Sequence, residues 1–217
     1  MKIYFLLATL LIATSACAVF QEIEYKIQLS DADQHNFMQW LQEHATHKGS
    51  SHQKDSYLTR RDHTTWHYEQ GFRDTDTMFR IRESSNKGAY ICYKYCHRDA
   101  NNMPLYRDEY ETSIKDATAV FTFLEAFAGP LDITVVEKTR TTYLVGTMFE
   151  VACDEVVGIG NFIEIELKQP VPSVQEGCAL IEDFLRSRGI NHFVKLTHSY
   201  LHMAWNPGYN FKIERIL

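Results

Sequence analysis

The chain has 217 residues, 45% of them hydrophobic and 13% aromatic, so it is long enough to bury the core of one domain. Its 28 acidic and 22 basic side chains leave a formal net charge of -6, which argues against general electrostatic binding to nucleic acid or to an anionic membrane. With only 10 Gly and 5 Pro, the composition also excludes a collagen-like or disordered chain.

The first 18 residues differ from the rest of the chain. Lys2 precedes an apolar run from Ile3 to Ile12, and Ala16-Cys17-Ala18 forms an A-x-A cleavage pattern. We predict a signal peptide over residues 1–18 and a single domain over residues 19–217, which would then be exported or periplasmic. The run is too short to span a bilayer comfortably, so we expect no stable membrane insertion of the mature chain. Two alternatives stay open: an ordinary buried element in a cytoplasmic protein, and lipidation at Cys17.

Four stretches are predicted to be helices. Ser30 and Ser173 are N-cap residues with an acid three positions later, and Gly129-Pro130 ends an apolar helical pattern. The predicted helices begin at Ser30, Ala117, Ser173 and about Thr197, and their apolar positions include Phe121, Phe123 and Phe127, expected in the core. His198 and His202 are expected on a helix surface, because no third metal ligand accompanies them.

The cysteines after residue 18 have spacings that define neither a zinc site nor a dense disulfide framework. They are Cys92, Cys96, Cys153 and Cys178. We expect them to be small packing residues.

Between the predicted helices, charged residues alternate with apolar ones, the two-residue period of a strand whose faces meet different environments. The apolar faces must pack against the helices, so the charged faces are expected on the side of the sheet opposite the core. The charged positions are Glu22, Glu24 and Lys26; Arg80 and Arg82; Arg107, Glu109 and Glu111; Lys138 and Arg140; and Glu164, Glu166 and Lys168.

Such charged faces can line a lumen if the sheet curls. Arg and Lys on several strands would then bind a ligand rich in anionic oxygens, because guanidinium groups hold phosphate through paired hydrogen bonds. The interleaved carboxylates would repel a polyphosphate unless a hard divalent cation, Mg²⁺ or Mn²⁺, bridged them to its oxygens. For any single strand, the alternative is a solvated outer face with cross-strand ion pairs.

The same residues resemble, in order, the motifs of the CYTH, or triphosphate tunnel metalloenzyme, superfamily. Over residues 21–205 the similar motifs are Glu22-Ile23-Glu24-Tyr25-Lys26, Asp55-Ser56-Tyr57, Phe79-Arg80-Ile81-Arg82, Tyr93-Lys94, Arg107-Asp108-Glu109-Tyr110-Glu111, Glu137-Lys138-Thr139-Arg140 and Ser199-Tyr200. The segment from Asp154 to Glu166 closely resembles the late strand pair of the class IV adenylyl cyclase branch.

The resemblance implies an α+β fold: a closed eight-stranded antiparallel β-barrel that forms a triphosphate tunnel and is flanked by helices. The implied triphosphate-binding residues are Lys26, Arg80, Arg82, Lys94, Arg107, Lys138, Arg140 and Lys195. The implied ligands of Mg²⁺ or Mn²⁺ are Glu22, Glu24, Asp154, Glu164 and Glu166. The implied catalytic pair is Lys26 and Tyr57, with the pKa of Lys26 lowered by neighbouring Arg residues.

Three functions are compatible with this pattern. The leading hypothesis is metal-dependent hydrolysis of inorganic triphosphate or of a triphosphate ester such as ATP or thiamine triphosphate. The alternatives are a class IV adenylyl cyclase, which forms cyclic AMP and pyrophosphate from ATP, and a non-catalytic polyphosphate-binding module. In each case the expected partner is a small-molecule triphosphate and not nucleic acid, and a homodimer is left open.

Overall fold

The computed structural model describes residues 20–59, 65–67, 72–101, 103–129 and 131–217. The predicted signal peptide, residues 1–18, lies outside the described residues. In the part of the chain that is described, no helix combines the length and hydropathy needed to cross a membrane.

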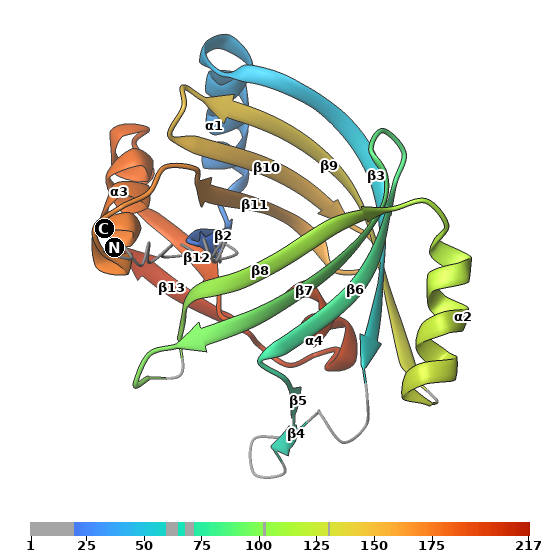
Figure 1. The fold of residues 1–217 in the computed structure, drawn as a ribbon. Coiled ribbons are helices and arrows are strands. Elements are labelled where there is room, and N and C mark those ends of the chain that lie inside the picture. The colour runs from blue at the N-terminus through green and yellow to red at the C-terminus, as the bar shows by residue number, and fades with distance from the viewer. Residues whose placement is uncertain (1–19, 60–64, 68–71, 102, 130) are drawn as a thin grey trace, which may run out of the picture.

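The described residues form one large antiparallel sheet, one small two-stranded sheet and four helices (Figure 1). The strands are β1 (Phe20–Glu22), β2 (Glu24–Gln28), β3 (Thr46–Thr59), β4 (Thr65–His67), β5 (Phe72–Asp74), β6 (Thr77–Ser84), β7 (Gly88–Arg98), β8 (Pro104–Ile114), β9 (Asp132–Val145), β10 (Phe149–Val156), β11 (Gly160–Leu167), β12 (His192–Leu196) and β13 (Lys212–Ile216). The helices are α1 (Asp31–His44), α2 (Ala117–Ala128), α3 (Val174–Ser187) and α4 (Tyr200–Trp205).

All four predicted helices are present, and their ends follow the expected local chemistry. The Ser30 and Ser173 hydroxyl oxygens each accept the backbone N–H three residues later, at 3.2 Å, which satisfies a free donor of the first turn. Gly129 follows α2 with φ 76°, a left-handed conformation that glycine adopts without steric cost. The last helix is shorter than predicted and begins at Tyr200.

The antiparallel α+β architecture is confirmed, but the closed eight-stranded barrel is wrong. The large sheet has eleven strands in the order β1-β8-β7-β6-β3-β9-β10-β11-β2-β12-β13, so hydrogen-bonded pairing does not run in a closed ring. Two features account for the difference. The C-terminal hairpin of β12 and β13 adds strands beyond β2, and the first strand divides at Ile23, with β1 pairing with β8 and β2 with β11.

The two faces of the curled sheet are apolar outside and charged inside, as the alternating pattern predicts. Ile27, Val151 and Ile165 are fully buried on the outer side, where they join Leu41 of α1 and Leu185 of α3 in the main core. Figure 1 shows α1 and α3 lying against the outside of the sheet on the side of β9, β10 and β11. The charged residues at the alternate positions therefore point into the space that the sheet surrounds.

Helix α4 covers one end of that space. Leu201 is fully buried and Tyr200 is nearly so, in a second apolar cluster with side chains from β3, β6, β9, β10 and β11. Through this cluster α4 packs at the lower end of the space that the sheet surrounds (Figure 1). The charged interior is thus a cup with an apolar floor.

Two further sequence predictions are wrong. Phe123 and Phe127 of α2 are 65% and 81% exposed, because α2 lies outside the sheet and buries none of its side chains. His198 and His202 are buried, since both approach the Asp74 carboxylate of β5, at 3.6 Å and 2.8 Å respectively. These contacts attach β5 to α4. Cys92, Cys96, Cys153 and Cys178 are free thiols, and Cys92 and Cys96 are buried.

The contrast between the outer core and α2 gives a stability prediction. We expect Ile165→Ala to lower the free energy of unfolding by about 2–5 kcal/mol, because it leaves a cavity under the helices. Phe127→Ser should change it by less than about 0.5 kcal/mol, because the ring is already in solvent. Urea unfolding of both variants checks this; comparable losses would show that α2 is part of the folded core.

Candidate functional site

The curled sheet encloses a cavity of about 570 Å³ whose wall is mostly ionised. Its acidic and basic residues come from strands whose inward positions repeat every two residues, which is why side chains distant in sequence meet here. The basic lining residues are Lys26, Lys48, Arg80, Arg82, Lys87, Lys94, Arg107, Lys138, Arg140 and Lys168, and the acidic ones are Glu22, Glu24, Glu109, Glu111, Glu150, Glu164 and Glu166.

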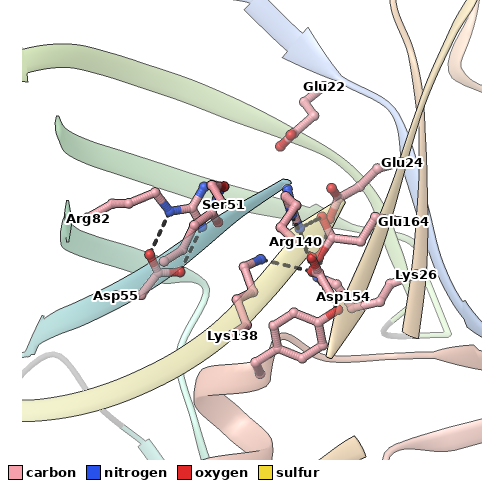
Figure 2. Close-up of polar contacts among 12 residues, drawn as sticks. Glu22, Glu24, Lys26, Ser51, Asp55, Arg82, Lys138, Arg140, Asp154 and Glu164 are labelled. Atoms are coloured by element: carbon pink, nitrogen blue, oxygen red, sulfur yellow. Dashed lines mark hydrogen bonds and ion pairs between the residues drawn. The ribbon is translucent and has the colours of Figure 1, made fainter. Parts of the chain in front are cut away.

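Asp55 on β3 holds two of the arginines in place. Its carboxylate, 1% exposed, accepts hydrogen bonds from Arg82 Nε at 2.6 Å and Nη2 at 2.7 Å, and from Arg80 Nη1 at 3.4 Å (Figure 2 shows the Asp55–Arg82 pair). Burial raises the pKa of Asp55, but the charges of Arg80 and Arg82 outweigh burial and hold the pKa well below its usual range. Arg80 Nε is buried and has no protein partner among the described residues, so this arginine retains a donor for a ligand.

Asp154 on β10 plays the same part on the other side of the cavity. Its carboxylate accepts hydrogen bonds from Lys138 Nζ at 2.9 Å, Arg140 Nε at 2.6 Å and the Tyr200 hydroxyl at 3.0 Å. Figure 2 shows Lys138 and Arg140 converging on it. With 2% exposure and these donors around it, Asp154 lies behind the cavity wall and does not line it. Burial and the neighbouring Arg140 lower the pKa of Lys138 to about 7.

The glutamates of β1, β2 and β11 form the acidic part of the wall. Glu24 and Glu164 both approach Lys26 Nζ, at 3.7 Å and 2.9 Å, and Glu22 is paired with Lys94. Burial, with the charge of Glu22 and then of Glu24, raises the pKa of Glu166 to about 7. Its pKa stays raised although Lys168 Nζ donates to it at 2.7 Å. The four glutamates offer carboxylate oxygens, the hard ligands that a divalent cation such as Mg²⁺ or Mn²⁺ takes.

A second possible set of metal ligands fits less well. One atom each of Cys92, Glu109 and Glu111 lies within 4.8 Å of the others on β7 and β8. However, Lys94 Nζ already pairs with Glu109 at 3.2 Å, and burial raises the pKa of the Cys92 thiol to about 11. A protonated thiol is a poor metal ligand, whereas the glutamates of β1, β2 and β11 offer only carboxylate oxygens, the ligands that Mg²⁺ and Mn²⁺ prefer.

The expected Lys26–Tyr57 pair is not formed in this structure. The Tyr57 hydroxyl accepts from Arg80 Nη1 at 3.5 Å, whereas Lys26 lies between Glu24 and Glu164. Burial lowers the pKa of Lys26, but the charges of Glu164 and Glu24 raise it above its usual value, so the expected lowering is wrong. Lys26 therefore carries its positive charge at neutral pH.

Most of the other residues implied by the resemblance meet in the cavity. Lys94 and Arg107 line it, and Arg107 Nη1 donates to Glu24 at 2.6 Å. Lys195 does not reach it: its ammonium group lies 3.5 Å from the centre of the Tyr25 ring, toward α3. Apart from Lys195 and Asp154, all the site residues predicted from the sequence line the cavity.

Two cavity-lining residues of β3, Ser51 and Gln53, were not predicted from the sequence. Ser51 and Gln53 face the cavity because they lie four and two positions before Asp55 on the same strand. The two-residue period, extended backward from Tyr57, would have found them. Lys48 and Lys87 had no such signal, since they lie near the start of β3 and just before β7, where alternation does not determine direction.

The buried Asp55 gives a pH-dependent prediction. Its native pKa lies below the unfolded value of about 3.9, so the ionised carboxylate stabilises the fold above about pH 4, and this contribution is lost as the pH falls toward the native pKa. We expect Asp55→Asn to cost about 3 kcal/mol at pH 7, because two buried arginines lose their counterion. The difference from wild type should narrow below pH 4.

Urea unfolding between pH 2.5 and 7 checks this, with Asp183→Asn on the exposed face of α3 as the control, which should have little effect at any pH. An Asp55→Asn deficit that did not depend on pH would contradict the assignment of the ionised form.

Comparison with known proteins places this geometry in a family. The CYTH domain family model matches residues 21–200. The fold is similar to that of PH1819 from Pyrococcus horikoshii OT3, with TM-score 0.63 and 24% identity over 84% of this chain and 97% of that one. It is also similar to a candidate adenylate cyclase from Vibrio parahaemolyticus, with TM-score 0.57 and 15% identity over 78% and 88% of the two chains.

A third similar structure is a candidate adenylyl cyclase from Hippeastrum, HpAC1, described as having a dominant triphosphatase activity. It has TM-score 0.54 and 14% identity over 88% of this chain and 91% of that one. No significant match is found among curated proteins. These identities show a shared fold, while the family match covers most of the chain and nearly all of the cavity wall. The chain belongs to the CYTH domain family.

Proposed function

We propose that the protein is a divalent-metal-dependent phosphohydrolase that cleaves a P–O–P bond of inorganic triphosphate or of a triphosphate ester inside the charged cavity. The observation that carries the proposal is the arrangement of the wall. Arginines fixed by Asp55 and a lysine–arginine pair fixed by Asp154 face the same cavity as the glutamates of β1, β2 and β11.

The basic residues would bind the phosphate oxygens. A guanidinium that is already held by a buried carboxylate needs little reorganisation when an anion arrives, and this preorganisation is the main source of electrostatic catalysis. The unpaired Arg80 Nε supports the assignment, because a phosphate oxygen would complete its hydrogen bonding. Three further basic residues are paired with glutamates and could also contact the phosphate oxygens: Lys26, Lys94 and Arg107.

Glu22, Glu24, Glu164 and Glu166 would hold the metal, and Asp154 would act from behind the wall by positioning Lys138 and Arg140. A bound Mg²⁺ or Mn²⁺ would neutralise charge on the transferred phosphoryl group and the leaving group. Tyr57, whose pKa is raised by burial, would keep its proton and donate a hydrogen bond from the floor of the cup. Lys26, protonated, would stabilise negative charge and would not act as a base.

A class IV adenylyl cyclase is the second candidate. It is supported by the segment from Asp154 to Glu166, which forms the β10–β11 hairpin of the acidic wall, and by the fold shared with candidate adenylate cyclases. The cavity volume lies within the range that holds small organic ligands, so a nucleoside can be accommodated beside a triphosphate. A binding module without turnover is the third outcome that the assays below separate.

Removing either half of the charged wall should abolish hydrolysis. We expect Glu24→Gln and Arg82→Ala each to lower kcat/KM for Mg²⁺- or Mn²⁺-dependent phosphate release by about 100-fold or more, because each removes charge stabilisation at the transferred group. The matched controls are Glu43→Gln and Arg186→Ala, on exposed helix surfaces. Unchanged phosphate release in Glu24→Gln and Arg82→Ala would refute the proposal.

The products distinguish hydrolysis from cyclisation. With ATP and Mn²⁺, we expect orthophosphate to accumulate without cyclic AMP. The basic residues of the cavity would bind the phosphates, whereas the sequence pattern contains no recognisable adenine-binding site. Phosphate, pyrophosphate and cyclic AMP are measured together in one reaction. Cyclic AMP with pyrophosphate would establish the cyclase, and tight tripolyphosphate binding without any product would establish the binding module.

A further inference from the structure

One stretch of the cavity wall is uncharged. Strand β3 contributes Ser51 and Gln53 and the adjacent β9 contributes Thr142, whereas most of the surrounding lining is Lys, Arg or Glu. The hydroxyls of Ser51 and Thr142 and the amide N–H of Gln53 can donate to phosphate oxygens, but the amide oxygen of Gln53 can only accept a hydrogen bond. This oxygen is the group that a triphosphate does not satisfy.

Gln53 has a hydrogen-bond acceptor that no described protein group satisfies. Its side chain is 7% exposed and its Nε2 donates to Ser51 Oγ at 3.2 Å. Its Oε1 is buried and has no hydrogen-bond partner among the described residues. A buried acceptor without a donor destabilises the fold, so a donor from a ligand or from a bound water would complete its hydrogen bonding.

The oxygens of a triphosphate cannot supply it. Ionised phosphate oxygens only accept hydrogen bonds, so they pair with the arginines and not with an amide oxygen. The partner of Gln53 Oε1 must therefore carry an O–H or N–H group. Inorganic triphosphate offers no such group when fully ionised, whereas the organic part of an ester can.

The sheet order also separates Gln53 from the acidic wall. Three strands lie between β3 and β2 in one direction, and three lie between β3 and β1 in the other. Gln53 thus faces the cavity from the side opposite Glu22 and Glu24, with the basic residues of β6 and β9 beside it. This favours an organic group of the substrate as the donor over a water bound to a metal among those glutamates.

We infer that Gln53 Oε1 accepts a hydrogen bond from a hydroxyl or amino group of an organic triphosphate ester, and so makes the site selective for such an ester over inorganic triphosphate. The inference rests on the proposed function and names its substrate class. The ester group would lie against Gln53 on β3, and the triphosphate would reach the basic residues of β6 and β9, the strands on either side of β3. The cavity of about 570 Å³ has room for both parts.

The test measures the ratio of kcat/KM for an organic triphosphate ester to kcat/KM for inorganic triphosphate. Phosphate release is followed with ATP, thiamine triphosphate, methyl triphosphate, which has no donor on its organic part, and inorganic triphosphate. Wild type should prefer ATP or thiamine triphosphate to methyl triphosphate. Gln53→Met should lower the kcat/KM ratio of the preferred ester to inorganic triphosphate about tenfold, the effect of one lost hydrogen bond.

Two further variants and the KM for Mg²⁺ distinguish a contact with the ester group from a general loss of activity or a metal-bound water. Gln53→Glu keeps an acceptor oxygen, so it should keep the ratio even if its charge weakens all triphosphates together. Gln39→Met, the same substitution on exposed α1, should change nothing. A ratio that stays constant in Gln53→Met would overturn the inference, as would an equal loss with every substrate or a rise only in the KM for Mg²⁺, which would indicate a metal-bound water.

Failure of the proposed hydrolysis can be distinguished from failure of the Gln53 contact. If wild type releases no phosphate from any of the four compounds, hydrolysis is refuted, and the same ratio is then taken from titration calorimetry of ATP and inorganic triphosphate. A tenfold loss of ATP preference in Gln53→Met would still support the contact, and an unchanged preference would overturn it.

Discussion

Two buried aspartates determine what the cavity can bind. Asp55 and Asp154 lie behind the wall, and each fixes a pair of basic side chains, Arg80 and Arg82 or Lys138 and Arg140. Several cations could not crowd around one cavity without these counterions, because burial penalises every uncompensated charge. The aspartates therefore allow a concentration of positive charge and also hold the guanidinium groups in the orientation that an anionic ligand needs.

The division of the sheet into a charged inner face and an apolar outer face follows from the two-residue period of its strands. Along β2 and β11, Ile27 and Ile165 pack beneath the helices while Lys26 and Glu164 face inward. Helix α4 adds an apolar cluster at one end of the ionised interior. The glutamates of β1, β2 and β11 lie on one side of the cavity, and the uncharged residues of β3 lie opposite them. Basic residues of β6 and β9 lie on either side of β3.

Much of this site follows from local sequence. The alternation of Glu22, Glu24 and Lys26 predicts a strand with a charged face, and the N-cap serines predict where α1 and α3 begin. The errors concern relations between distant segments. Lys26 has a raised pKa because Glu164, 138 positions away, lies 2.9 Å from it, and His202 is buried because the Asp74 carboxylate of β5 meets it. The pattern of a helix or strand does not contain such distances.

By itself, the sequence determined the four helices and the alternating charged faces of the strands, because these depend on periodicity within single segments, and its ordered motifs carried the resemblance to the CYTH family. Only the tertiary structure decided how many strands the sheet has, that α4 packs at the floor, and that Asp154 lies behind the wall instead of lining it. Those outcomes depend on which strands pair and how far the sheet curls. Both are fixed by burial of the apolar face against helices from elsewhere in the chain.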